Sequence, residues 1–468
     1  MFKRFAAACG ALALLHAGHV LAHEPSGRDV REAMKRAAVF FRSISTNGGY
    51  CGIYSLDLTR RYGEAFYERA GAHEIWIQPP GTPTVGEVFL RAHRATRDND
   101  YLAAATEVGK ALAWAQRTAG GWDHRANMSH FKPDAGKISR RTGRCTFDDN
   151  ITQGALSFLI RLDEAADQPW LTESVELALK FVMTAQFKNG AWPQWYPLRG
   201  GYHRYYTFND NTINDCIRVM VQAHRAYKKP EYLRSARRGG DFIIRSQLPA
   251  PQAGWAQQYS HDLKPAWARA FEPPGVCSAV TARNIRTLVD LHLYTRDGRY
   301  LKPVPAAVQW LETSKLRKDR WARLYEVGTN KPIYGDRDRK IHYTLDEISA
   351  ERRSGYSWQS SYGIPGVIRY HEKVTKLGAA RYLADAAKPA GAKERRARAT
   401  ALEPTVRRII AGLDRKGRWL TRTDRKGRPL KQPVIYASMF VDNMKVLCKY
   451  LELLGNGPWA RQGGPGNS

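Results

Sequence analysis

The sequence predicts an all-α protein whose helices form an α/α toroid. A unit of two helices followed by a turn with a Trp recurs along the chain. The chain also begins and ends with half of such a unit, and its aromatic content of 11% and apolar content of 43% support a large core. An open helical solenoid is the alternative, but half-units at both ends favour a closed ring of up to six hairpins.

Four complete copies of the unit end at Trp122, Trp192, Trp255 and Trp321. In each copy an apolar residue lies twelve positions before an aromatic residue, and the Trp follows 21 to 23 positions later. These pairs are Phe89 with Tyr101, Phe158 with Trp170, Met220 with Tyr232, and Leu288 with Tyr300. Apolar residues spaced by three and four predict amphipathic helices, and the short Asp/Gly/Pro connections make the two helices antiparallel.

The two ends of the chain complete the pattern. A fifth copy begins with Tyr370 and Tyr382, and an Ala/Lys/Arg-rich insertion delays its Trp to Trp419. Residues 30–50 resemble only the second helix of a unit and its turn, and residues 440–455 resemble only a first helix. Together they predict a sixth hairpin that joins the termini. We therefore expect one α/α-toroid domain over residues 23–458 and a disordered tail at 459–468.

Residues 1–22 have the features of a secretory signal. Lys3 and Arg4 precede an apolar run at 5–15, and small side chains at 20–22 allow cleavage after Ala22. No later run reaches the roughly 18 apolar residues that a membrane-spanning helix needs. We therefore expect an exported protein, periplasmic or extracellular. The five cysteines after the cleavage point are odd in number and widely spaced, so at most two disulfides form.

The charge favours an acidic partner. The chain has 74 Lys and Arg against 44 Asp and Glu, which gives +30, or +28 without Lys3 and Arg4. Nucleic acid, an acidic polysaccharide and a membrane surface all fit this charge. An exported protein meets polysaccharide more often, so we expect a monomer that binds an acidic polysaccharide, with no nucleic-acid or membrane partner. The basic run at 414–428 is interrupted by Asp and Gly, which favours a surface hairpin over a nucleic-acid arm.

Paired carboxylates mark the start of two repeats. "TFDDN" (146–150) and "TFNDN" (207–211) precede first helices, and "FVDN" (440–443) begins the closing helix. In a ring of parallel first helices, Asp148, Asp149, Asp210 and Asp442 come out at the same end, where hard cations such as Ca²⁺ collect oxygen ligands. Helix capping is the competing interpretation for any one of them. A cap needs one acceptor, so Asp149, which aligns with Asp210, is the candidate cap, and Asp148 is left to face the cleft.

Two long connections, residues 123–147 and 322–360, follow turns and are expected at this same end, with the ligand cleft. The segment "HDLKPAWARAFEPPG" (261–275) adds further charges there. Arg in such loops is either a structural clamp or a bidentate ligand for carboxylates, and a solvated loop is the alternative for the second connection. Trp195 and Tyr196 are candidates for stacking on sugar faces, whereas Trp192 occupies the turn position of its repeat and is expected in the core. The charged and aromatic candidates are Lys264, Arg269, Glu272, Arg337, Arg339, Arg352, Arg353 and Tyr356.

Six ordered motifs resemble the pectate lyases of polysaccharide lyase family ten. They are "TFDDNITQ", "NGAWPQWYP", "TFNDNTIND", "PAWARAFEPP", "YEVGTNKPI" and "ERRSGYSW", and the resemblance is strongest over residues 110–360. The sequence departs from the family pattern in an extra repeat before residue 110, in "GVCS" at 275–278 and in its high charge. The resemblance implies an α/α-barrel that cleaves polygalacturonate by β-elimination with Ca²⁺.

Carried over by motif, the resemblance implies roles for individual residues. Arg269 would be the catalytic base, and Asp148, Asp149 and Asp210 would surround the metal and the uronate carboxylate, with Asp148 counted as catalytic. We expect substrate contacts from Lys264, Arg339, Arg353, Tyr356 and Trp195. Elimination removes a weakly acidic proton next to a carboxylate, so the charge that develops there must be neutralised by a cation and by Arg side chains. Arg is a poor base because its pKa exceeds about 12, so it must act in a dry site or at alkaline pH.

Two other functions fit the same residues. A glycoside hydrolase on the same ring would need two carboxylates roughly 5 to 10 Å apart, for which Asp148 and Asp210 are candidates. A non-catalytic protein that binds acidic glycans would fit the positive charge. The lyase is distinguished from both by an unsaturated product and by sensitivity to chelators.

Overall fold

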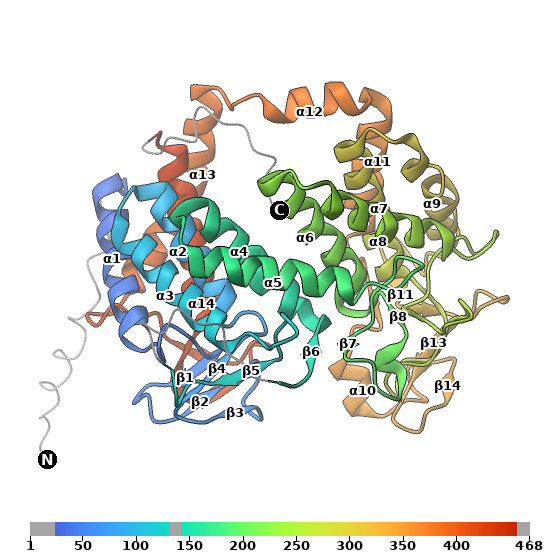
Figure 1. The fold of residues 1–468 in the computed structure, drawn as a ribbon, viewed down its shortest axis with the longest axis horizontal. Coiled ribbons are helices and arrows are strands. Elements are labelled where there is room, and N and C mark those ends of the chain that lie inside the picture. Colours follow the sequence, from blue (N-terminus) through green and yellow to red (C-terminus); the bar gives the residue numbers. More distant parts are fainter. Residues whose placement is uncertain (1–23, 132–141, 456–468) are drawn as a thin grey trace, which may run out of the picture.

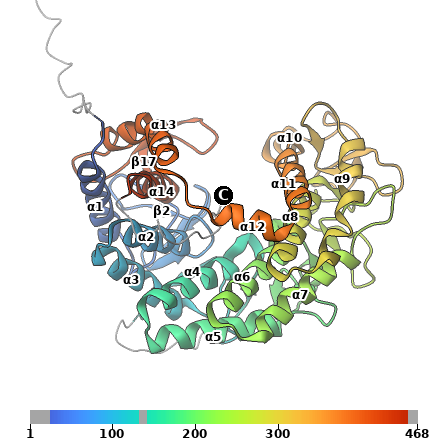
Figure 2. The same cartoon turned by 90° about the horizontal axis from the view of Figure 1, so that it is seen from above.

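The helices pair into antiparallel hairpins that follow one another round a ring, which confirms the predicted α/α toroid (Figures 1 and 2). This arrangement comes from a computed structural model, which describes residues 24–131 and 142–455. The expected signal peptide and the C-terminal tail lie outside the described residues. The helices are α1 (Gly27–Ser43), α2 (Thr82–Thr96), α3 (Asn99–Ala115), α4 (Ile151–Ala166), α5 (Pro169–Thr184), α6 (Thr212–Tyr227), α7 (Pro230–Arg245), α8 (Ser278–Thr295), α9 (Val304–Thr313), α10 (Ala350–Gly355), α11 (Ile364–Leu377), α12 (Ala379–Ala387), α13 (Ala392–Ala411) and α14 (Ala437–Leu453).

Short strands connect the hairpins. They are β1 (Ile53–Ser55), β2 (Arg61–Tyr62), β3 (Arg69–Ala70), β4 (Glu74–Trp76), β5 (Arg125–Asn127), β6 (Cys145–Thr146), β7 (Trp195–Tyr196), β8 (Tyr206–Thr207), β9 (Gln258–Tyr259), β10 (Val276–Cys277), β11 (Trp321–Ala322), β12 (Leu324–Tyr325), β13 (Pro332–Gly335), β14 (Ile341–His342), β15 (Gln359–Ser360), β16 (Thr421–Thr423) and β17 (Pro429–Tyr436). All their pairings are antiparallel. The sheet orders are β16-β17-β1-β2-β3, β10-β12-β13-β14, and the pairs β11-β15, β4-β5, β6-β7 and β8-β9.

Each of the first four complete repeats is a closed unit of strand, two helices, buried Trp and strand. The strand before the first helix pairs with the strand that begins three residues after the Trp, as β6 pairs with β7 and β8 with β9. The indole N–H of the Trp donates to a carbonyl of the second helix in every unit. These bonds join Trp122 to Leu112 (2.8 Å), Trp192 to Val182 (2.8 Å), Trp255 to Ile243 (2.7 Å), Trp321 to Leu311 (2.6 Å) and Trp419 to Ile409 (2.8 Å). The recurring spacing of the Trp along the chain therefore reflects a buried hydrogen bond, and Trp192 is a core residue as predicted.

The two termini form a sixth unit, as the half-units predict. Helix α14 packs against α1 and α2, and β17 pairs with β1 so that Ile53 lies opposite Tyr436. Tyr50 takes the place of the Trp three residues before β1 and is 2% exposed. Helices α14, α2, α4, α6, α8 and α11 follow one another on the inside of the ring, and the second helices lie outside (Figure 2). The expected "FVDN" start of this helix was wrong by one turn, since α14 begins at Ala437.

The fifth unit is split by its insertion. Helix α11 packs against α8 and α12, whereas α13 packs against α14 and α1 on the other side of the ring. Helix α12 extends between them (Figure 2) and has no buried residue. Fourteen residues, 378–391, separate α11 from α13. This length allows α13 to pack in the sixth unit instead of against α11, its expected partner. Trp419 still follows α13 as its turn Trp.

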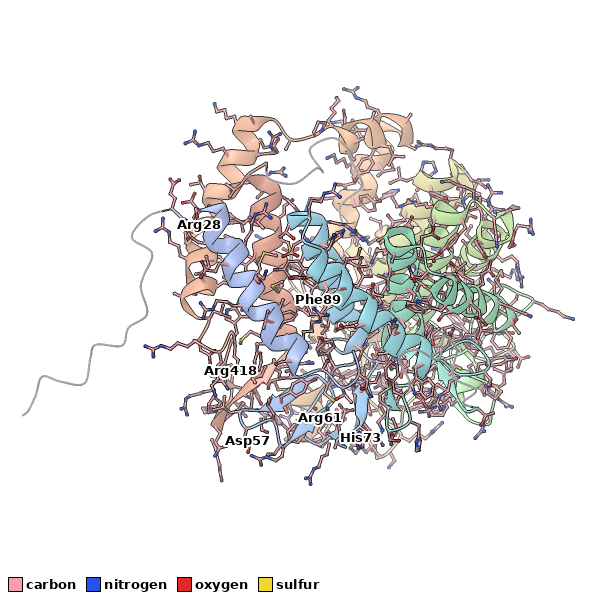
Figure 3. The ribbon with its side chains drawn as sticks, turned by 60° about the vertical axis from the view of Figure 1, so that its left-hand side comes forward. Arg28, Asp57, Arg61, His73, Phe89 and Arg418 are labelled. Carbon is pink, nitrogen blue, oxygen red and sulfur yellow. The ribbon has the colours of Figure 1, made fainter. Side chains whose placement is uncertain are left out.

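The strands and long connections gather at one end of the ring (Figure 1). Figure 3 shows Asp57, Arg61 and His73 at this end and Arg28 at the opposite one. The basic run at 414–428 contributes β16 and the turn to β17, which confirms the predicted surface hairpin. All five cysteines of the described chain are buried as free thiols. Within residues 24–131 and 142–455, no helix is both long and apolar enough to cross a membrane.

Candidate active site

Two 3₁₀ turns, η1 (Asp148–Asn150) and η3 (Asn209–Asn211), lie side by side at the strand end of the ring. Each follows a two-residue strand, and the strand's Thr hydroxyl accepts the N–H two residues later at 3.0 Å. Asp149 (φ 46°) and Asp210 (φ 46°) both adopt the left-handed conformation. This backbone costs a non-glycine residue roughly 1–2 kcal/mol. Its occurrence at the same place in two units indicates that the fold holds these carboxylates in position for a purpose other than stability.

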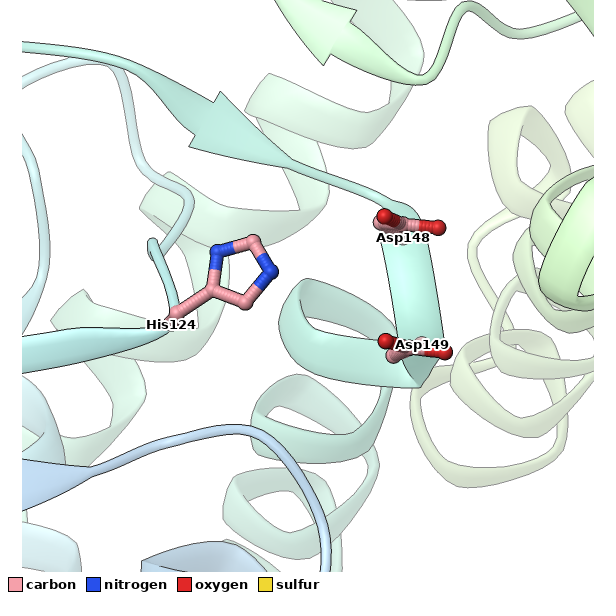
Figure 4. A group of neighbouring side chains, drawn as sticks. All are labelled: His124, Asp148 and Asp149. Atoms are coloured by element: carbon pink, nitrogen blue, oxygen red, sulfur yellow. The ribbon is translucent and has the colours of Figure 1, made fainter. Parts of the chain in front are cut away.

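The carboxylates lie close enough together to raise one another's pKa. Ligand atoms of His124, Asp148 and Asp149 all lie within 4.8 Å of one another (Figure 4). Burial, followed by the charge of Asp210, raises the pKa of Asp149 to about 6, and burial with the charge of Asp148 raises the pKa of Asp210 to about 7. The pKa of Asp148 is raised by burial and by Asp149. These shifts mean that ionising the three carboxylates together costs free energy.

The oxygen atoms around the turns fit a hard cation. Asp148 Oδ1 is buried and has no hydrogen-bond partner among the described residues, and the same holds for Gln194 Oε1 and Asn209 Oδ1. A buried oxygen without a partner costs about 1–3 kcal/mol, so such atoms are rarely left together. Carboxylate and amide oxygens are the ligands that Ca²⁺ prefers. The oxygens of Asp148 and Asp149 therefore fit a hard cation such as Ca²⁺, whereas Asp210, on the neighbouring turn, is outside the group whose ligand atoms lie within 4.8 Å of one another.

The position two residues after the turn Trp supplies a further side chain in four of the units. It holds His124, Gln194, Gln257 and Arg323. His124 was not predicted from the sequence, although its offset from Trp122 equals that of Gln194 from Trp192. His124 Nδ1 lies 2.9 Å from Asp123 Oδ1, so the opposite nitrogen is the one available to the aspartates. Burial lowers the pKa of His124, but the hydrogen bond and charge of Asp123 outweigh it and raise the pKa overall.

The sequence left two points about the aspartates open, the capping by Asp149 and the place of Asp442. Asp149 does not cap its helix, since no side-chain cap bond occurs at η1 or α4, and its Oδ2 accepts a hydrogen bond from Gln78 instead. Asp442 lies inside α14 with 73% of its side chain exposed and Lys445 at 4.0 Å, and it is not in the group around Asp148. The helix begins earlier than expected, so Asp442 is one turn along it rather than at its tip.

Arg269 is brought to the aspartates by its own loop. Its Nε and Nη2 donate to the two oxygens of Glu272 at 2.8 and 2.7 Å, and Nη2 lies 3.8 Å from Asp210. Tyr356 donates its hydroxyl to Glu272 at 2.7 Å, which fixes the carboxylate from the other side. Burial lowers the pKa of Arg269, but the hydrogen bonds to Glu272 and the charges of Glu272 and Asp210 raise it further. The guanidinium is therefore a cation held rigidly beside the acidic group.

A family model described as pectic acid lyase matches residues 116–366, more than half of the chain. The chain belongs to the pectic acid lyase family. It is accordingly a polysaccharide lyase of the pectate lyase class. The match includes His124, Asp148, Asp210, Arg269 and Arg353. Residues 24–115 and helices α12–α14 lie outside it.

Solved structures with a similar course of the chain come from several enzymes. The family 10 polysaccharide lyase from Cellvibrio cellulosa is 22% identical, with a TM-score of 0.49, over 63% of this chain and 98% of that one. A mutant of that lyase in complex with trigalaturonic acid has the same identity and TM-score over 62% of this chain and 98% of that one. Cellobiose 2-epimerase from Bacillus thermoamylovorans is 12% identical, with a TM-score of 0.47, over 91% and 98%. No curated protein matches the chain.

Within the region that matches the lyase family, Arg339 lines a cavity of about 470 Å³ next to Arg269. Its guanidinium lies 5.3 Å from the ring centre of Trp267. The remaining lining residues are Gly201, Tyr202, Arg204, Tyr205, Ala266 and Ala268. The lining has two cations and no carboxylate. Trp267, Tyr202 and Arg204 were not predicted from the sequence, because only the fold brings their two segments together.

The other predicted substrate residues lie in different surroundings. Lys264 is exposed in the same loop as Arg269. Arg353 pairs with Asp346, which is 91% exposed, at 2.9 Å. The Trp195 ring has Arg144 at 4.2 Å and a parallel His203 ring at 3.3 Å from its centre. Two groups this close to one ring centre must occupy opposite faces, so both faces of Trp195 are covered.

Proposed function

We propose that the protein is an exported pectate lyase that cleaves polygalacturonate by β-elimination. In this proposal Asp148, Asp149 and Asp210 hold Ca²⁺ and Arg269 is the base. The observation that supports it most directly is the Arg269 guanidinium 3.8 Å from Asp210, at the edge of an acidic group whose Asp148 oxygen has no partner among the described residues. Membership of the pectic acid lyase family supports the same reaction class. The charge of +30 supports an acidic polymer as substrate.

The reaction breaks the C5–H and C4–O bonds of a uronate and forms a C4–C5 double bond. Ca²⁺, when bound, would withdraw charge from the uronate carboxylate as the C5 proton leaves. Nε and Nη2 of Arg269 donate to Glu272, so Nη1 is the nitrogen that faces the substrate. In its neutral form Nη1 takes the C5 proton and later returns it to solvent, and the departing oxygen takes a proton from water. Because Glu272 raises the pKa of Arg269, the rate rises with pH over the alkaline range.

The cavity beside Arg269 supports a binding role for Arg339, and Lys264, which does not line this cavity, would bind substrate from its exposed position in the same loop. A uronate carries a carboxylate that Arg binds through two parallel hydrogen bonds, and its sugar face packs against aromatic rings. Arg204, Arg339 and Trp267 offer both kinds of contact in one cavity. Tyr356 contributes indirectly, because its hydroxyl holds Glu272 and so fixes Arg269. Arg353 and Trp195 would join the site only after their present contacts with Asp346, Arg144 and His203 open.

One assay tests the proposed reaction. The purified protein is incubated with polygalacturonate, and the ultraviolet absorbance of the unsaturated product is followed with Ca²⁺, with excess chelator, and with Ca²⁺ restored. We expect absorbance to rise only with Ca²⁺, and Asp148→Ala to show none. New reducing ends without absorbance, unaffected by chelator, would indicate a hydrolase. Binding without either product would indicate a glycan-binding protein. Either result overturns the proposal.

A further inference from the structure

The segment before the family match reaches the acidic group through Gln78. This residue lies between β4 and α2, is 5% exposed, and donates from Nε2 to Asp149 Oδ2 at 2.7 Å and to Glu64 Oε2 at 3.0 Å. Both of its amide hydrogens are therefore used by carboxylates. The backbone of the same segment is bonded to the other side of the group, since Ile77 N–H donates to the His124 carbonyl at 2.7 Å. The segment thus contacts two members of the group directly.

The orientation of the Gln78 amide is fixed by a neighbour. The Trp76 indole donates to Gln78 Oε1 at 3.3 Å, so a flipped amide would place N–H groups against each other. Gly63 packs closely against the Trp76 ring, since a Cβ at that position would come within 2.2 Å of a ring carbon. The N–H groups of Gln78 must therefore point at Asp149 and Glu64. On its far side, Glu64 Oε1 accepts from Arg425 at 3.3 Å.

We propose that Gln78 is a positioning residue that orients Asp149 as a one-oxygen ligand of the cation. The inference rests on the proposed function, because it concerns the same Ca²⁺ site. Because Oδ2 accepts the Gln78 N–H, Asp149 would present Oδ1 to a bound cation, and rotating the carboxylate to offer both oxygens would cost this hydrogen bond. Gln78, Trp76 and Glu64 all lie outside residues 116–366, so the N-terminal segment adds this support to the part of the chain that matches the family. Hydrogen bonds behind a ligand commonly change metal affinity by about 10–100-fold.

The test compares Gln78→Met with Tyr67→Ala. Met has the length of Gln but no N–H, whereas Tyr67 lies in the same segment, is 87% exposed and serves as the control. Ca²⁺ affinity is measured by titration calorimetry at pH 8, and thermal unfolding with a chelator checks that each variant is folded. We expect Ca²⁺ to bind Gln78→Met about 10–100-fold more weakly and Tyr67→Ala as tightly as the wild type.

A second readout separates positioning from damage to the fold. Turnover of polygalacturonate by Gln78→Met, measured against Ca²⁺ concentration, should shift to higher Ca²⁺ and reach a plateau within a few-fold of the wild type. A lowered plateau without a shift, or a wild-type Ca²⁺ affinity, would overturn this inference alone and leave the proposed function in place. If the wild-type protein itself binds no Ca²⁺, both the proposed function and the inference fail.

Discussion

The second and third repeats form the two halves of the candidate site on almost the same backbone. "TFDDN" and "TFNDN" share a strand, a Thr that accepts from the N–H two residues on, and a left-handed Asp with φ 46°. The two motifs differ in the residue that contacts the left-handed Asp. Asp149 is bonded to Gln78 from the preceding segment, and Asp210 lies 3.8 Å from Arg269 in the following loop. The repeated backbone therefore places the carboxylates, while their different partners give one half a neutral support and the other a cation.

A single side chain accounts for the remaining difference. Asp148 in the second repeat corresponds to Asn209 in the third, which is 3% exposed. Both have a buried oxygen without a partner among the described residues. The Asp contributes a charge and the Asn a neutral oxygen, so the group contains three aspartates rather than four. A fourth would add a buried charge next to Asp210, whose pKa is already raised to about 7. The asymmetry limits repulsion while it keeps the number of oxygen ligands.

The largest effect on activity should come from replacing Arg269, the cation that lies beside the third-repeat half of the site only. Arg269→Lys keeps a positive charge beside Glu272 and Asp210 but loses the two-bond contact. We expect kcat to fall about 10³-fold, because a positioned proton acceptor contributes roughly 10²–10⁴-fold. Affinity for an oligogalacturonate, measured by calorimetry, should change by less than tenfold. If kcat falls less than tenfold, Arg269 is not the base and serves only to neutralise charge.

Asp148→Asn converts "TFDDN" into "TFNDN" and makes the two halves alike. Because a charged ligand is replaced by a neutral one of the same shape, we expect Ca²⁺ affinity to fall by about 10²-fold, measured by calorimetry. The reciprocal change, Asn209→Asp, buries an extra carboxylate. It should lower the free energy of unfolding without metal by about 1–3 kcal/mol, measured by urea titration with a chelator. Equal Ca²⁺ affinity in wild type and Asp148→Asn would show that the charge difference between the halves is incidental.

Much of this comparison was predictable because the fold repeats. The spacing of the turn Trp predicted the hairpins, and half-units predicted closure, since each Trp makes the same buried bond and the termini reproduce the unit with Tyr50. The place of "TFDDN" and "TFNDN" in the repeat predicted that Asp148 and Asp210 would meet. These features follow from the periodicity of the repeats, which can be seen in a single sequence.

The partners of the aspartates were harder to predict because they come from distant segments. Gln78 is 71 residues from Asp149, and nothing in its local sequence marks it. His124 was detectable only from its offset to Trp122, a pattern that becomes meaningful once Gln194 and Gln257 are seen at the same position. The capping hypothesis for Asp149 failed because Asn150 occupies the N-cap position of α4 and the Asp149 carboxylate is bonded to Gln78. The split of the fifth unit depends on where α13 finds a partner, which the insertion itself does not specify.

The shared acidic group should make stability depend on pH. Unfolded Asp loses its proton near pH 4, whereas Asp149 and Asp210 hold theirs until about pH 6 and about pH 7. Between these values the folded state binds more protons, so the stability of the metal-free protein falls as pH rises, and the loss is complete above about pH 7. We expect a decrease on the order of 2 kcal/mol from pH 5 to pH 8, measured by thermal unfolding with a chelator, and recovery with Ca²⁺.

Asp210→Asn provides the control for this pH dependence. It removes the carboxylate with the higher pKa and should flatten the profile between pH 6 and pH 7 more than the profile below pH 6. The matched change in the other half, Asp149→Asn, should flatten the lower part. Unchanged profiles in both variants would mean that the two halves do not share one electrostatic group.

The smallest expected effect is on KM, and it compares the Trp residue near each half of the site. Trp195 follows the second repeat and has both ring faces covered by Arg144 and His203, whereas Trp267 follows the third and lines the cavity with Arg339. Trp267→Ala should raise KM about 5-fold, because a sugar–aromatic contact is worth roughly 1 kcal/mol. Trp195→Ala should lower the thermal unfolding temperature and change KM by less than 2-fold. A larger rise in KM for Trp195→Ala than for Trp267→Ala would show that the stack with Arg144 and His203 opens and that the substrate lies along the second repeat.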